Sequence, residues 1–123
     1  MNQFTNAIGI DVSKKTLDGC DHLHQAVFQV PNGPAGFKDL LKWAKKNNGD
    51  LTKVLLCFEH TGMYSLPLAV YLSDQGLSYA MVPGLEIKRS LGLRRGKSDR
   101  ADAQGIARYA YQRREEIRIY QLP

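Results

Sequence analysis

The chain has 123 residues, which is enough for one domain with its own hydrophobic core. Its hydrophobic fraction of 43% and charged fraction of 24% are those of an ordinary globular protein. No apolar run approaches the length of a membrane span, and the N-terminus lacks the basic start and apolar core of a signal peptide. The composition therefore excludes a membrane-spanning protein, and we expect a single cytoplasmic domain.

The net charge of +5 comes entirely from the C-terminal third of the chain. Residues 1–84 contain seven Lys, no Arg and seven Asp or Glu, so their charges balance. Residues 85–123 contain ten basic and five acidic side chains. Such one-sided clustering is the pattern expected for a polyanion partner such as a nucleic acid, and a solvated basic face explains it equally well.

Three strands are predicted near the N-terminus. The alternation in residues 7–12 predicts a buried strand, with three aliphatic side chains on one face and Ala7, Gly9 and Asp11 on the other. Residues 16–21 and 24–30 predict two more strands, and the short separations favour an antiparallel meander. Cys20 and Cys57 each fall inside a predicted strand, so we expect two buried, reduced thiols.

Helices and strands alternate in the rest of the chain. Pro34 begins a predicted helix that ends at the Asn-Asn-Gly sequence of residues 47–49. The apolar run 54–58 predicts a strand buried on both faces, and Thr61 can cap a helix that runs to Gln75. Residues 79–82 predict a further strand, and after a basic stretch a last helix begins at Ser98 or Asp99 and ends near Arg114.

This order of elements predicts an α/β fold. Two later strands that are separated by helices imply parallel crossovers onto the antiparallel meander. The expected structure is a mixed five-stranded sheet, three antiparallel strands followed by two parallel ones, with flanking helices. That arrangement is RNase H-like, of the RuvC-like kind, and residues 1–123 are expected to form one such domain.

Two acidic residues end two predicted strands. Asp11 ends the first strand on the face that it shares with Ala7 and Gly9, whose small size leaves room for a ligand. Glu59 ends the strand 54–58 in the same way. A turn-capping Asp and a Glu that has merely reached solvent are the structural alternatives. Because these two strands are neighbours in an RNase H-like sheet, that fold predicts that the two carboxylates converge.

A second acidic pair lies near the start of the last predicted helix. Asp99 and Asp102 are three residues apart, so they would share one helical face, and the same stripe continues into Ile106 and Tyr109. A structural explanation is the favourable interaction of acids with a helix N-terminus. The placement of both acids on the inward stripe, within the most basic part of the chain, favours a functional site.

Four converging carboxylates would need a counter-charge. Oxygen ligands of this kind suit Mg²⁺ or Mn²⁺, and two such ions about 3.5–4 Å apart can activate a nucleophile and stabilise a phosphate leaving group. Basic side chains around the site would then hold a nucleic-acid backbone. The candidates are Lys14, Lys88, Arg89, Arg94, Arg95, Lys97 and Arg100.

Three motifs resemble the signature of a known family. The motifs are GIDVSK at residues 9–14, FEHTGMY at residues 58–64 and KSDRADA at residues 97–103. Together they resemble the signature of DEDD-type insertion-sequence transposases. This family is related to the Piv invertase, and its N-terminal domain is RuvC-like. The resemblance covers essentially the whole chain, and Ser98 and Ala101 are its small departures, where the family more often has Thr and a larger aliphatic residue. It implies that Asp11, Glu59, Asp99 and Asp102 are the catalytic, metal-binding tetrad of a DNA transposase or recombinase.

The same resemblance implies several partners. Members of the family carry a second, C-terminal domain with a catalytic serine, and this chain ends at Pro123 without it. We therefore expect that the chain alone does not complete strand exchange. The resemblance also implies a homo-oligomer that acts on DNA and binds a structured guide RNA.

Other functions are compatible with parts of the sequence. A stand-alone RuvC-like nuclease would use the same tetrad without a second domain, and a non-catalytic nucleic-acid-binding module would use its acids only as caps. The segment 92–98 nearly matches a nucleotide-binding P-loop, but its spacing is one residue short and it does not follow a strand directly. A transposase domain remains the leading hypothesis.

Overall fold

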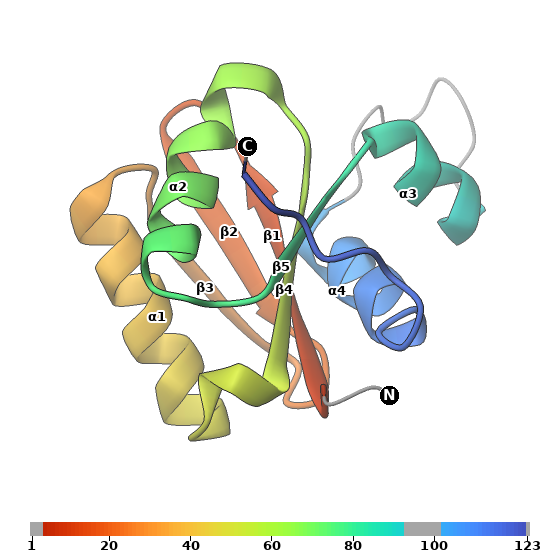
Figure 1. Cartoon of the computed structure of the whole chain (residues 1–123), viewed down its shortest axis with the longest axis horizontal. Helices are drawn as coiled ribbons and strands as arrows, with labels where there is room; N and C mark the ends of the chain where they lie inside the picture. Colours follow the sequence, from red (N-terminus) through yellow and green to blue (C-terminus); the bar gives the residue numbers. More distant parts are fainter. Residues whose placement is uncertain (1–3, 93–101, 123) are drawn as a thin grey trace.

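The computed structural model describes residues 4–92 and 102–122 of the chain. These residues form a five-stranded sheet in the order β3-β2-β1-β4-β5, with helices on both of its faces (Figure 1). The strands are β1 (Asn6–Val12), β2 (Thr16–Asp21), β3 (Ala26–Pro31), β4 (Val54–Glu59) and β5 (Tyr79–Val82). The helices are α1 (Pro34–Asn48), α2 (Leu66–Asp74), α3 (Gly84–Leu91) and α4 (Ala103–Gln112), with short 3₁₀ turns η1 (Leu51–Lys53) and η2 (Gly62–Tyr64).

The sheet is mixed in the way that the sequence predicts. Strand β1 pairs with β2, and β2 with β3, in antiparallel orientation. Strand β4 pairs with β1 and β5 pairs with β4 in parallel orientation, after crossovers that contain α1 and α2. The RNase H-like fold class is thereby confirmed.

The sheet has an apolar core on each face. On one face, α1 and α2 cover a cluster that includes Ile8, Ile10 and Phe58. On the other face, α3 and α4 cover a second cluster that includes Leu55 and Cys57. Figure 1 shows α1 and α2 on the side of the sheet opposite α3 and α4. Strand β4 is buried on both faces, which explains its uninterrupted apolar sequence.

Helix α4 packs unusually close to β1 because Gly9 has no side chain. A Cβ on Gly9 would overlap the backbone of Ala103 and Ala107 in the first two turns of the helix. Farther along, the Arg114 side chain donates a hydrogen bond from Nε to the Phe4 carbonyl at 3.2 Å. Helix α4 therefore runs antiparallel to β1, and its N-terminus points toward the sheet edge at which β1 ends.

The structure corrects three expectations about the helices. The helix predicted from Thr61 to Gln75 is instead η2 followed by α2, because Pro67 occupies the first turn of a new helix. The basic stretch after β5 includes a helix, α3, which the sequence analysis did not predict.

The third correction concerns the last helix. It begins at Ala103 and not at Ser98 or Asp99, because Asp102 has extended backbone angles (φ −79°, ψ 173°) and serves as the N-cap. The helix ends at Gln112, two residues before the predicted end. As a result, Asp102 precedes α4 instead of lying on one of its faces, and Asp99 lies outside the described residues.

Two further features of the described residues bear on the expectations for membrane spans and for the cysteines. None of the helices in residues 4–92 and 102–122 combines the length and apolar character needed to cross a membrane. Cys20 and Cys57 are both buried, free thiols. Burial, with a smaller contribution from the charge of Glu86, raises the pKa of Cys57 to about 12, so this thiol stays protonated near neutral pH.

Candidate functional site

The pairing of β1 with β4 brings Asp11 and Glu59 to adjacent positions. Ile10 is the register partner of Phe58 in this parallel pair, so the next residue of each strand is an acid. Residues at matching positions of parallel strands point to the same face, and here that face is the one covered by α4. The register therefore places the two strand-end acids at neighbouring positions on one face of the sheet.

The Glu59 carboxylate lies in a tight environment at the start of α3. A Cβ on Gly84, the first residue of α3, would overlap the Glu59 carboxylate. The Oε2 atom of Glu59 is buried and has no hydrogen-bond partner among the described residues. A buried carboxylate oxygen without a donor is unfavourable in an otherwise satisfied structure, and a cation is one partner that would satisfy it.

Asp102 lies at the N-terminus of α4, and its role there is partly structural. Its Oδ1 accepts a hydrogen bond from the Gly105 backbone N–H at 2.8 Å, which is the usual geometry of an N-cap. The side chain is exposed, but it is close enough to the sheet to contribute to the raised pKa of Cys20, after burial and the charge of Asp21. One of the two carboxylate oxygens of Asp102 therefore has the structural role of capping α4.

The four predicted acids are only partly described. Asp99 lies outside the described residues. Within residues 4–92 and 102–122, no three His, Cys, Asp or Glu side chains lie close enough together to hold one metal ion. The structure therefore brings together Asp11 and Glu59, and it places Asp102 at the end of α4 nearest to them without completing a ligand set.

The register also brings a further acid, which is not among the predicted site residues, opposite Asp11. Asp18 on β2 is directly opposite Asp11 in the antiparallel pair of β1 and β2. Its Oδ1 accepts a hydrogen bond from Gln29 Nε2 at 2.8 Å. The alternation of residues 16–21 shows only that Asp18 shares a face with Cys20, and the pairing with Asp11 depends on the geometry of the intervening turn.

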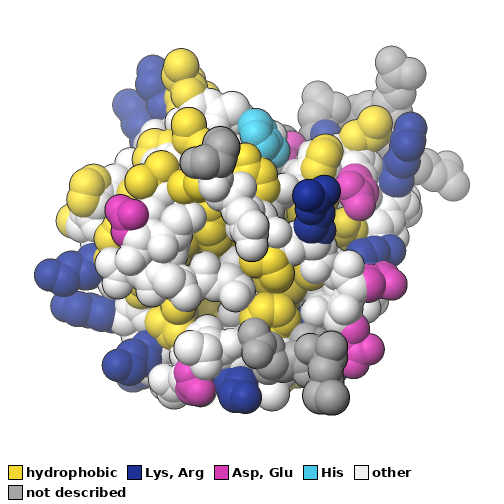
Figure 2. Space-filling model, in the orientation of Figure 1, with side chains coloured by type: hydrophobic (Ala, Val, Ile, Leu, Met, Phe, Trp, Pro, Cys, Tyr) yellow, Lys and Arg dark blue, Asp and Glu magenta, His cyan; other side chains and the backbone are white. Residues whose placement is uncertain are grey.

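The basic residues predicted to hold nucleic acid are described in part. Lys14 is exposed in the β1–β2 turn, three residues after Asp11, and Lys88 and Arg89 lie in the last turn of α3. Arg94, Arg95, Lys97 and Arg100 lie outside the described residues. On the face shown in Figure 2, Lys and Arg side chains at the left edge lie over α1, on the side of the sheet away from α4.

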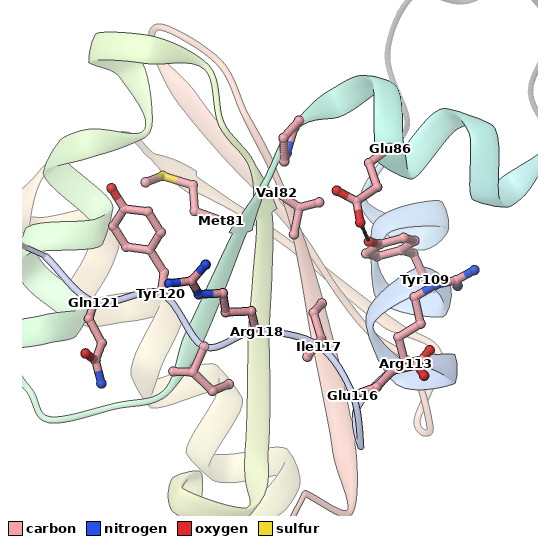
Figure 3. A pocket seen from close by; sticks show the side chains of 12 residues that line it. Met81, Val82, Glu86, Tyr109, Arg113, Glu116, Ile117, Arg118, Tyr120 and Gln121 are labelled. Atoms are coloured by element: carbon pink, nitrogen blue, oxygen red, sulfur yellow. Dashed lines mark hydrogen bonds between the residues drawn. The ribbon is translucent and has the colours of Figure 1, made fainter.

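A separate open pocket of about 1130 Å³ lies beyond β5. It is lined by β5, α3, α4 and the C-terminal segment, and the side chains of Glu86 and Tyr109 meet inside it (Figure 3). The Tyr109 hydroxyl donates a hydrogen bond to Glu86 Oε1 at 3.1 Å. Burial, followed by the nearby Glu86 charge, raises the pKa of Tyr109 to about 12. Of the predicted tetrad, the three acids that the structure describes, Asp11, Glu59 and Asp102, do not line this pocket.

The sequence of residues 8–123 matches the sequence model of an IS110-type DEDD family whose description is "Transposase". The chain belongs to the DEDD transposase family. It is 33% identical over 107 residues to the pilin gene-inverting proteins of Moraxella bovis and Moraxella lacunata. The match covers 83% of this chain and 33% of each relative, so the chain spans about a third of the length of these two relatives.

Proposed function

We propose that this chain is the metal-dependent catalytic domain of a DNA transposase or site-specific recombinase, which cleaves and transfers DNA strands in the cytoplasm. Family membership supports a DNA-recombining enzyme. The observation that carries the catalytic part of the proposal is the adjacent placement of Asp11 and Glu59 on one face of the sheet, at the ends of β1 and β4.

The residues at this site fit a hard divalent cation. Carboxylate oxygens are the ligands that Mg²⁺ and Mn²⁺ prefer, and the buried Oε2 of Glu59 has no donor among the described residues. Gly84 leaves the Glu59 carboxylate the space that a side chain would fill. When bound, the cation would supply Lewis-acid activation of the nucleophile and stabilisation of the leaving oxygen of a phosphodiester.

Asp102 and Asp99 complete the proposed ligand set. Capping of α4 engages only Oδ1 of Asp102 with Gly105, which leaves the second oxygen for a ligand. The end of α4 that carries Asp102 is the end nearest to Asp11, because Gly9 lets the helix approach β1. Asp99, which lies outside the described residues, is the remaining proposed ligand.

DNA is the proposed substrate, and its phosphates would be held by basic residues around the acids. Lys14, Lys88 and Arg89 lie on the two segments that flank the ends of β1 and β5. Four further basic residues, which lie outside the described residues, are proposed to bind DNA phosphates as well: Arg94, Arg95, Lys97 and Arg100. Binding of a guide RNA and assembly into a homo-oligomer, both implied by the family resemblance, belong to the same proposal.

Metal-dependent thermal stabilisation tests the proposal. Mn²⁺ at about ten times its Kd would stabilise the folded chain by about 1.4 kcal/mol. For a domain of this size that corresponds to a rise of roughly 3–6 °C in Tm. The rise is expected to disappear in Asp11→Asn and Glu59→Gln, and to persist in the surface controls Asp39→Asn and Glu115→Gln. An equal rise in Tm in the unchanged chain and in all four variants would instead identify a non-catalytic module.

A further inference from the structure

We propose that Asp18 is an additional acidic residue of the cation site, which strengthens the binding of the divalent cation at Asp11. The inference deepens the proposed function and rests on it, because it requires a cation at Asp11 and Glu59. Asp18 belongs to none of the three motifs on which the predicted tetrad is based, so its role follows from the sheet alone.

The placement of Asp18 comes from the register of β1 and β2. Asp11 and Asp18 are direct partners in this antiparallel pair, so their side chains point to the same face with Cβ atoms about 5 Å apart. The next pair on that face is Gly9 with Cys20, and both contact the first turns of α4. Asp18 and Asp11 are each half-buried. The two carboxylates therefore lie on the side of the sheet that carries the candidate site.

Two like charges that are directly opposite each other destabilise a sheet, and the effect grows with partial burial. Gln29, the register partner of Asp18 on β3, donates a neutral amide hydrogen bond from Nε2 to Asp18 Oδ1 at 2.8 Å. Within residues 4–92 and 102–122, no Lys or Arg lies within salt-bridge distance of Asp18. The Gln29 amide orients the Asp18 carboxylate but does not compensate its charge, and a divalent cation between the strands would.

A second observation on the same face also points to a cation. Glu59 Oε2 is buried without a hydrogen-bond partner among the described residues, and Glu59 neighbours Asp11 on the other side of β1. The adjacent strands β2, β1 and β4 thus each place one carboxylate on this face, at neighbouring positions. Because no three described acids lie close enough to share one ion, Asp18 acts through its charge and as a positioning residue for Asp11.

The test measures Mn²⁺ affinity by isothermal titration calorimetry, together with the Tm of the metal-free chain. Asp18→Asn is expected to weaken Mn²⁺ binding roughly three- to tenfold, or about 0.7–1.4 kcal/mol. The Tm of the metal-free chain shows whether this variant keeps the fold. Asp18→Glu keeps the charge and is expected to bind Mn²⁺ within about twofold of the unchanged chain. Asp39→Asn, on α1, is the matched control for both measurements.

The outcomes separate this inference from the proposed function. If the unchanged chain binds Mn²⁺ and Asp11→Asn abolishes binding, but Asp18→Asn binds like the unchanged chain, the inference is wrong and the proposed function stands. A lower metal-free Tm together with unchanged affinity in Asp18→Asn would show a purely structural role and would also overturn it. Failure of the unchanged chain to bind Mn²⁺ would overturn both.

Discussion

The Glu59 carboxylate lies against Gly84, at the point where α3 begins, with no room between them for a Cβ. Glu59 ends β4, and Gly84 follows β5, the neighbouring strand. The absence of a side chain at residue 84 therefore decides where the Glu59 carboxylate can lie. Since the contact is with the end of a flexible side chain, the Glu59 position is more easily disturbed than the backbone around it.

Gly84→Ala is predicted to impair metal binding while preserving the fold. The new methyl group would displace the Glu59 carboxylate from its position at the site, and rotation of that side chain costs little stability. Stabilisation by Mn²⁺ should fall by half or more, as measured by the metal-dependent Tm shift. Gly33→Ala is the control, because nothing lies within 4 Å of a Cβ at Gly33. Equal Mn²⁺ responses of the two variants would show that the Gly84 contact is unimportant.

Gly9→Ala is predicted to destabilise the fold. Here the added methyl group meets the backbone of Ala103 and Ala107, which cannot move without displacing α4. The free energy of unfolding, measured by urea denaturation, should fall by roughly 1–3 kcal/mol. Gly19→Ala, in the neighbouring strand, is the comparison, because its nearest contacts are side-chain atoms of Leu40 and Trp43 at 3.4 Å. A loss for Gly19→Ala as large as that for Gly9→Ala would contradict this explanation.

Lys88→Ala and Arg89→Ala are predicted to weaken DNA binding without changing metal binding. Each side chain lies on α3, which begins at the Glu59 contact, and each would neutralise one phosphate. The slope of log K against log salt concentration should decrease by about one for each variant. Lys42→Ala and Lys45→Ala, on α1 at the far face of the sheet, are the controls and should leave the slope unchanged. A uniform response of all four variants would indicate non-specific attraction to a basic protein.

A buried network around Asp21 is predicted to make stability depend on acid pH. Burial would raise the pKa of Asp21, but hydrogen bonds from Asn6, from the backbone and ring of His24 and from Asn48 outweigh it, so the pKa is lowered. This contribution to stability is therefore complete above about pH 3.9, the value in the unfolded chain, and is lost as the pH falls through the folded pKa. Asp21→Asn is expected to lower stability at pH 7 by roughly 1–3 kcal/mol.

Urea denaturation at several pH values checks this prediction. The difference in stability between the unchanged chain and Asp21→Asn should shrink as the pH is lowered below 4. Asp39→Asn, an exposed acid on α1, should change little at either pH. If the difference for Asp21→Asn were the same at pH 3 and pH 7, the network would not depend on the charge of Asp21.

Much of the fold is predictable because it follows from periodicity. The alternation around Gly9 and the apolar run before Glu59 identify β1 and β4, and a mixed sheet then makes these two strands neighbours. Helix α3 is not apparent from the sequence because it is short and basic. Its Ile87 is fully buried but its Leu85 is exposed, so the segment resembles a basic loop. The start of α4 was misplaced because an Asp can either cap a helix or occupy its first turn, and Asp102 caps it.

The site was harder to predict than the fold. Sequence spacing indicates that Asp11 and Glu59 end strands, but the contribution of Asp18 depends on a strand register that a one-residue slip would abolish. The Ser13–Thr16 hydrogen bonds that close the β1–β2 turn fix this register, and they are not apparent from composition or periodicity. Likewise, the contact between Gly84 and Glu59 joins the start of α3 to the end of β4, two points that are 25 residues apart in the sequence.

The most direct measurement is the anomalous diffraction of Mn²⁺ bound to crystals of this chain. We predict a Mn²⁺ peak at the ends of β1 and β4, with carboxylate oxygens of Asp11 and Glu59 both about 2.0–2.3 Å from the ion. The peak should disappear in crystals of Asp11→Asn. Saturating Mn²⁺ with no peak between these two side chains, or a peak that only one of them contacts, would contradict the assignment of a shared metal site.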